Sequence, residues 1–236
     1  MNSRNRFTIQ QPDTAPNNKY DPATESKNQI LKTNIEEAEM TKYLTIAETA
    51  KIIRKALKEA FPDVKFSVRC RSITVGITWT DGPNVEQVKS VVGHLKAAYF
   101  DSSIDYQGSI YHMHQGQQVH LGADYLNFTR EYTDQAIQRG IDRVYREYAG
   151  NFKDADQEKA TVAQFRAGQL CNVVIPGLFD SYGQCRVVQQ LREVMAKNSD
   201  RLRVGKSPTA AAYFVTHDDN YSMTNGSGFS VIREAQ

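Results

Sequence analysis

The chain has 236 residues, of which 24% are charged, and its 29 Lys and Arg nearly balance its 27 Asp and Glu. This balance excludes a protein that coats nucleic acid through bulk positive charge alone. No apolar run reaches the length of a membrane span, so we expect no membrane partner. Three widely spaced cysteines without a CxxC pair or a signal peptide predict a reducing cytoplasm.

Residues 1–40 are predicted to be a mobile polar arm, because the stretch begins rich in Pro and Asn and shows almost no apolar periodicity. The first helix begins at Thr45-Ile46-Ala47-Glu48, which matches a capping box. Apolar residues then recur at three- and four-residue spacing as far as Phe61. Pro62 is expected to end this helix, because the residue before a proline is pushed out of the helical conformation.

Two period-2 runs follow, at residues 64–71 and 73–80, and each alternates apolar with polar side chains. Such a pair predicts an antiparallel hairpin with one buried face. After the turn Asp81-Gly82-Pro83, Asn84 is a good N-cap for a second helix. The apolar stripe of that helix is expected to continue as far as Tyr99.

Residues 104–111 and 118–130 both have strand character, on either side of a turn at Gln115-Gly116. Thr133 then caps a third helix, which is expected to end near Gly150. The predicted order is α-β-β-α-β-β-α. It describes an α+β fold in which helices cover one face of an antiparallel sheet.

The sequence therefore predicts three parts: the arm at residues 1–40, an α+β domain at residues 41–150 and a C-terminal region at residues 151–236. The last part is expected to be an extension of mixed helices and strands, with late strands at residues 211–216 and 229–232. Whether it packs on the first domain is left open by the pattern.

Several motifs of the first domain, taken in order, resemble a known family. They are the stretch of residues 44–62, the run VKFSVR, the turn WTDGP, the segment FDS and the segment HLGADY. Together they resemble large polyvalent protein associated domain 29 over about residues 42–132. The chain departs from the family where an Asp-Gly-Met pattern is replaced by Asp101-Ser102-Ser103. The resemblance implies a gene of a phage, a plasmid or another mobile element, and it gives no residue a catalytic role.

Histidines near the predicted hairpin form one candidate site. His112 and His114 stand two apart on a strand and so face the same way, and the hairpin brings His120 toward them. With Asp124 or Asp105 they are candidate ligands of a divalent metal. No HExxH or cysteine pair accompanies them, and ordinary histidines near a turn are the alternative.

Aspartates form a second candidate site. Asp101, Asp105 and Asp124 would hold Mg²⁺ or act as general acid and base if they converged. The alternative is that they only cap and turn the loops in which they stand.

Basic residues form a third candidate site, for binding a macromolecule. Four of them repeat along the first helix opposite its apolar stripe, and three share the outward side of the first strand. They are Lys51, Arg54, Lys55 and Lys58 on the helix, and Lys65, Arg69 and Arg71 on the strand. Cations placed in this way bind along a phosphate backbone or contact an acidic protein. A solvated helix face, with Glu48 and Glu59 nearby, is the alternative for the helical set.

These observations predict a phage or plasmid accessory protein in the cytoplasm of its bacterial host. It is expected to bind a host defence protein complex or nucleic acid, as anti-restriction or anti-CRISPR proteins do in counter-defence. No catalytic motif of high specificity is present, so the sequence favours binding over enzyme activity and no cofactor, with a divalent metal as the exception to be tested. The alternatives are a metal-dependent hydrolase acting on nucleic acid or a nucleotide, and a structural or dimerising module that forms a homodimer through exposed sheet edges.

Overall fold

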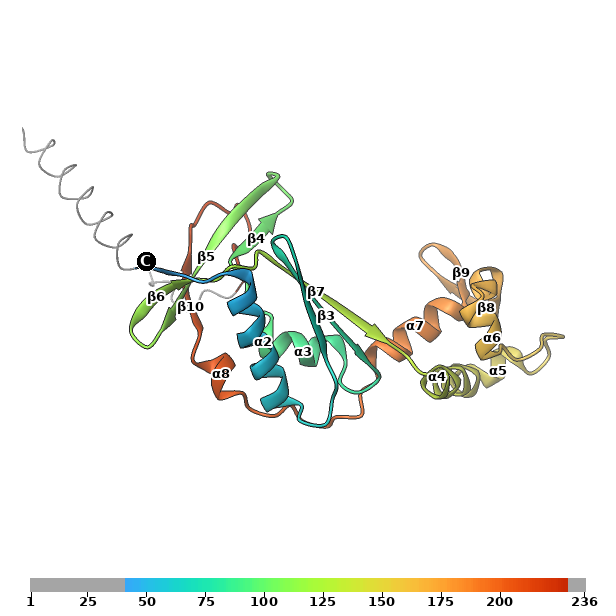
Figure 1. Ribbon diagram of the computed structural model, residues 1–236. Helices are drawn as coiled ribbons and strands as arrows, with labels where there is room; N and C mark the ends of the chain where they lie inside the picture. Colours follow the sequence, from blue (N-terminus) through green and yellow to red (C-terminus); the bar gives the residue numbers. More distant parts are fainter. Residues whose placement is uncertain (1–40, 229–236) are drawn as a thin grey trace, which may run out of the picture. The chain divides into compact units, whose positions relative to one another are not determined.

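The computed structural model describes residues 41–228, and Figure 1 shows their arrangement. The predicted arm at residues 1–40 and the candidate strand at residues 229–232 lie outside the described residues. Among residues 41–228, no helix combines the length and the apolar character that crossing a membrane requires. The three cysteines all lie in this part of the chain and are free thiols.

The α+β class predicted from the sequence is confirmed. The helices are α2 (Ile46–Ala60), α3 (Val85–Val92), α4 (Asp134–Glu147), α5 (Ala149–Phe152), α6 (Val162–Arg166), α7 (Val187–Lys197) and α8 (Pro208–Ala211), with a 3-10 turn at Gln169–Asn172. The strands are β1 (Lys42–Tyr43), β2 (Ser67–Arg71), β3 (Thr74–Thr80), β4 (Ala98–Asp101), β5 (Tyr106–His114), β6 (Gln117–His120), β7 (Tyr125–Glu131), β8 (Val174–Asp180), β9 (Gly183–Arg186) and β10 (Phe214–Asp218).

Helix α2 begins and ends where the sequence predicts. The Thr45 hydroxyl accepts a hydrogen bond from the Glu48 amide, and the Glu48 carboxylate accepts one from the Thr45 amide at 2.8 Å, which completes the capping box. The apolar stripe of α2, including Ile53 and Leu57, is buried, and the helix ends at the residue before Phe61.

Strands β2, β3 and β7 form one three-stranded sheet, with β3 in the middle. The β2–β3 hairpin is antiparallel, as predicted, and it places Arg69 opposite Gly76. Strand β7 lies parallel to β3 and places Asn127 opposite Gly76 on the other side. The sheet is therefore mixed, not purely antiparallel as expected. The connection from β3 to β7 runs through α3 and strands β4, β5 and β6, and a long crossover of this kind is what a parallel pair requires.

Strands β1, β6, β5 and β10 follow one another in a second sheet, and β4 pairs with the other part of β5. The β5–β6 hairpin turns at Gln115 and Gly116, both with positive φ, as predicted. The expectation that the second helix continues to Tyr99 is wrong: α3 ends at Val92, and Tyr99 pairs with Gly108 as part of β4. Ala97, Ala98 and Tyr99 are all buried, and the last two belong to the short strand β4. A run of consecutive apolar residues fits a buried strand as well as a buried helix, so the spacing does not separate these two structures.

The described residues bury two main apolar clusters. The larger one lies between α2, α3 and the β2–β3–β7 sheet, and Figure 1 shows both helices beside strands β3 and β7. The other cluster lies between α4 and α7, where Gly140 allows the Leu191 side chain to approach the α4 backbone. Helix α4, which the sequence assigns to the first domain, thus packs with C-terminal elements, and β10 from the C-terminal region pairs with β5.

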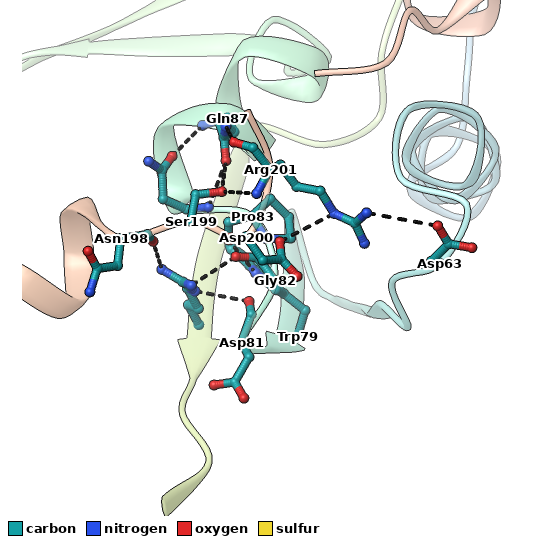
Figure 2. A network of polar contacts seen from close by, with 12 residues as sticks. Asp63, Trp79, Asp81, Gly82, Pro83, Gln87, Asn198, Ser199, Asp200 and Arg201 are labelled. Carbon is teal, nitrogen blue, oxygen red and sulfur yellow. Dashed lines mark hydrogen bonds and ion pairs between the residues drawn. The ribbon is translucent and has the colours of Figure 1, made fainter. Parts of the chain in front are cut away.

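Arg130, near the end of β7, joins these parts through its guanidinium group. Figure 2 labels three of the residues that it contacts, Asp81, Gly82 and Asn198. It donates hydrogen bonds to four backbone carbonyls: those of Asp81 at 3.0 Å, Gly82 at 2.9 Å, Met195 at 3.1 Å and Asn198 at 2.7 Å. Two of these acceptors belong to the turn after β3, and two lie at the C-terminal end of α7. One side chain therefore holds the turn, β7 and α7 together.

The same turn also positions the start of α4. The Asp81 carboxylate accepts hydrogen bonds from the amide and the hydroxyl of Thr133, at 3.0 and 2.6 Å, and Thr133 is the N-cap of α4. Asp81 itself has a φ of 53°, a left-handed conformation that aspartate tolerates better than most residues. The motif WTDGP is thus a structural junction.

Replacing Arg130 is expected to weaken this junction. Arg130→Ala should lower the free energy of unfolding by about 3 kcal/mol, because hydrogen bonds to a charged donor are lost at several carbonyls. Arg130→Lys should lower it by about 2 kcal/mol, because an ammonium group cannot reproduce the planar fork. Urea denaturation followed by circular dichroism measures both values. The matched control is Arg139→Ala. Arg139 is exposed and lines the same surface pocket as Arg130, and its replacement is expected to change the free energy of unfolding by less than about 0.5 kcal/mol. Equal effects at Arg130 and Arg139 would contradict this account.

Candidate nucleic-acid interface

The β2–β3–β7 sheet has one buried and one solvent-exposed face. Val75, Ile77 and Trp79 of β3 point into the core under α2 and α3. The alternate residues of β3, which are Thr74, Gly76 and Thr78, point the other way, because successive side chains of a strand face opposite sides. A groove of about 780 Å³ runs over this second face. It is lined by Ser67, Arg69, Arg71, Ser72, Thr74, Gly76, Thr78, Asn127 and Glu131.

Arg69 and Arg71 are the cations of this groove. Both are exposed and lie on the outward side of β2, as the alternation of the sequence predicts. The ion pairs formed among residues 41–228 include neither of them. Their guanidinium groups are therefore available to an anion from outside the described part of the chain.

The helical cations Lys51, Arg54 and Lys55 have other contacts than Arg69 and Arg71. Lys51 and Lys55 line a separate groove of about 450 Å³, together with His114, Tyr213 and α8. Arg54 donates a hydrogen bond to the carbonyl of Val68 at 2.7 Å and so occupies a backbone acceptor of β2. Lys51 and Lys55 thus line a different groove from Arg69 and Arg71.

The nearby acidic residues are engaged elsewhere. Glu48 belongs to the capping box, and Glu59 accepts hydrogen bonds from the hydroxyl and amide of Thr209 and from the Ser207 hydroxyl. These bonds, those from Thr209 above all, hold the pKa of Glu59 below its ordinary value. Glu59 therefore fixes the start of α8 against α2 and forms no ion pair with Lys51 or Lys55.

The predicted metal ligands contact different partners. The Nε2 atom of His112 lies 2.7 Å from the carbonyl oxygen of His94, His114 stacks on Tyr213, and His120 lies against Tyr43. Asp124 accepts a hydrogen bond from Gln107. Among residues 41–228, no group of three or more His, Cys, Asp or Glu side chains is placed to hold a metal ion. The metal site stays a prediction from the sequence.

The predicted acidic cluster is separated in the same way. Asp101 is buried and accepts hydrogen bonds from Ser103, Ser222 and Met223. These bonds, led by that from the Ser103 hydroxyl, hold its pKa far below the ordinary value. Asp105 has a φ of 51° in the turn before β5. Asp101 therefore stabilises the loops around it, in the way that the alternative interpretation describes.

Asp219 is a structural carboxylate that the sequence does not reveal. It accepts hydrogen bonds from the hydroxyls of Tyr99 and Tyr106 and from the amide of Ser109. Together with Asp101 it holds the segment after β10 against β4 and β5. The partners lie more than a hundred residues apart in the chain, so no local pattern connects them.

Residues 41–228 form a mixed α+β fold, and a groove lined by Arg69 and Arg71 lies over the exposed face of its β2–β3–β7 sheet. Residues 44–133 match the family model described as large polyvalent protein associated domain 29, which confirms the resemblance of the motifs. The matched segment reaches from the start of α2 to the N-cap of α4, so it contains the complete β2–β3–β7 sheet and all seven predicted cations. No curated protein and no solved structure matches the chain.

His112 is expected to make the fold sensitive to acid. It is fully buried, and burial lowers its pKa from 6.5 to about 4. The unfolded chain therefore takes up a proton on this residue before the folded chain does. The free energy of unfolding should be highest above pH 6.5 and fall by up to about 3 kcal/mol as the pH drops to 4.

Urea denaturation over this pH range tests the effect. His112→Gln should remove most of the His112 contribution to the acid slope, because an amide keeps a donor for the His94 carbonyl and does not titrate. The control is His217→Gln, an exposed histidine of the neighbouring strand β10, which should keep the slope of the unmodified protein. An unchanged slope in His112→Gln would show that other groups cause the acid sensitivity.

Proposed function

We propose that residues 44–133 act as a binding module of a mobile-element protein and hold nucleic acid over the exposed face of the β2–β3–β7 sheet. The observation that supports this most is the pair Arg69 and Arg71. Both are exposed beside a groove, and neither forms an ion pair within residues 41–228. A binding role of this kind requires no catalytic residue.

Phosphate is the anion that this pair suits. A guanidinium group presents a planar fork of donors and binds phosphate oxygens in a bidentate manner. Alternate residues of a strand repeat every ~6.7 Å, so Arg69 and Arg71 present two such forks in a row. The hydroxyls of Thr74 and Thr78 on β3 add neutral donors along the same groove.

The family match of residues 44–133 supports a role in counter-defence. A mobile element that enters a bacterial cell meets defence complexes which act on nucleic acid. A module that holds nucleic acid, or the nucleic-acid-binding side of such a complex, serves counter-defence in the host cytoplasm without catalysis. This proposed role rests on the family resemblance and on the basic groove. Binding experiments with the purified protein identify the partner of the module.

Removing the arginine pair is expected to weaken binding and its dependence on salt. Arg69→Ala with Arg71→Ala should reduce the slope of log K against log salt by about 1.4 to 1.8, since two phosphate contacts are lost. Affinity at about 50 mM salt should fall at least roughly tenfold. Fluorescence anisotropy with labelled DNA and RNA oligonucleotides measures both quantities. The matched control is Lys153→Ala with Arg192→Ala, two exposed cations near α5 and on α7 that change the net charge equally.

The outcomes separate the alternatives. Retention of no nucleic acid at low salt by the unmodified protein would contradict the proposal. An equal loss in the control pair would show that only net charge matters. Capture of an acidic host protein complex that depends on Arg69 and Arg71, without nucleic-acid binding, would reassign the groove to a protein partner. A mass measurement in the same buffer reports whether the protein forms a dimer.

A further inference from the structure

The groove over the β2–β3–β7 sheet has two chemically different walls. The β2 wall carries Arg69 and Arg71, and the β7 wall carries Asn127 and Glu131. Because the side chains of both strands alternate, these residues all lie on the same face as Gly76. One wall therefore attracts phosphate, and the other offers an amide and a carboxylate.

We infer that the nucleic acid bound here is a single strand, with its phosphates along β2 and its bases toward β7. The inference rests on the proposed function and specifies its ligand. Asn127 has both donors and acceptors for base edges, and Glu131 accepts hydrogen bonds from base amino groups. In a single strand these edges are free, whereas pairing occupies the Watson–Crick edges of a duplex.

The carboxylate of Glu131 distinguishes the two kinds of ligand. A duplex carries phosphates on both of its strands, so one backbone would approach the β7 wall when the other lies on Arg69 and Arg71. Repulsion between Glu131 and that second backbone disfavours the duplex. A single strand has phosphates on one side only and matches the asymmetry of the groove.

Gly76 forms part of the floor of the groove, beneath the proposed nucleic-acid strand. It is the third residue of β3, and its neighbours across the sheet are Arg69 and Asn127. A Cβ atom at Gly76 would meet only the Arg69 carbonyl oxygen, at 3.8 Å, which is ordinary van der Waals contact. The fold therefore does not require glycine here for steric reasons, although glycine weakens a strand interior. Glycine at such a position allows the close approach of a ligand to the backbone.

The size of the groove agrees with this occupant. Neighbouring strands lie ~4.8 Å apart, so the β2 and β7 walls stand about 10 Å apart across β3. The floor between them carries only the small side chains of Thr74 and Thr78 beside Gly76. Bases laid across this floor reach Asn127 from a backbone held by Arg69 and Arg71.

A larger side chain at Gly76, on the floor of the groove, tests the inference. Gly76→Ile places a β-branched side chain in the groove and suits a strand, so the protein should fold and its thermal midpoint should not fall. Its affinity for a labelled single strand of about twelve nucleotides should fall at least roughly tenfold. The matched control is Gly150→Ile, which adds the same side chain at a glycine of α5 whose Cβ would meet nothing within 4 Å. That control should bind like the unmodified protein.

A second variant tests the preference for a single strand over a duplex, and it leaves the groove unfilled. The unmodified protein should bind the single strand more tightly than the duplex of the same sequence, and Glu131→Gln should narrow this difference by improving duplex binding. Equal binding of both forms by the unmodified protein, or unchanged single-strand binding by Gly76→Ile, would overturn the inference. If Arg69→Ala with Arg71→Ala still weakened binding in that case, the proposed function would stand. If no nucleic acid bound at all, both would fail.

Discussion

The fold depends on how one guanidinium group satisfies the backbone of a turn. Arg130 donates to the carbonyls of Asp81 and Gly82 after β3 and to those of Met195 and Asn198 at the C-terminal end of α7. A turn with two left-handed residues exposes carbonyls that no regular strand or helix can pair, and burying them without a donor costs free energy. The planar fork of arginine meets several of them at once. This interaction ties β7 to the turn of its parallel neighbour.

The position of β7 in turn creates the proposed binding surface. Because β7 adds to the free edge of β3, the hairpin becomes a three-stranded sheet, and its groove acquires a second wall. The helices α2 and α3 bury the opposite face, and the polar face remains accessible to solvent. The surface thus combines a rigid support with exposed arginines, which is the arrangement that allows charged side chains to bind without first ordering the backbone.

Several carboxylates and one buried histidine have structural roles in the described part of the chain. Asp101 and Asp219 accept hydrogen bonds that hold the segment after β10, and Glu59 holds the start of α8. His112 is buried beside the carbonyl of His94. Each of these groups is engaged by its own chain, whereas Arg69 and Arg71 have no charged partner among residues 41–228. That contrast is why the groove, and not the histidines, carries the functional proposal.

The sequence by itself determined the local structure: the capping box at Thr45, the β2–β3 alternation, the turn at Gln115 and the outward direction of Arg69 and Arg71. These features depend on interactions between residues close in the chain, which periodicity and turn chemistry report. Only the tertiary structure decided that β7 lies parallel to β3, that Tyr99 belongs to a strand and that Lys51 and Lys55 line a different groove from Arg69 and Arg71. Such features depend on pairing between distant segments and on the burial of both faces, and no local pattern encodes them.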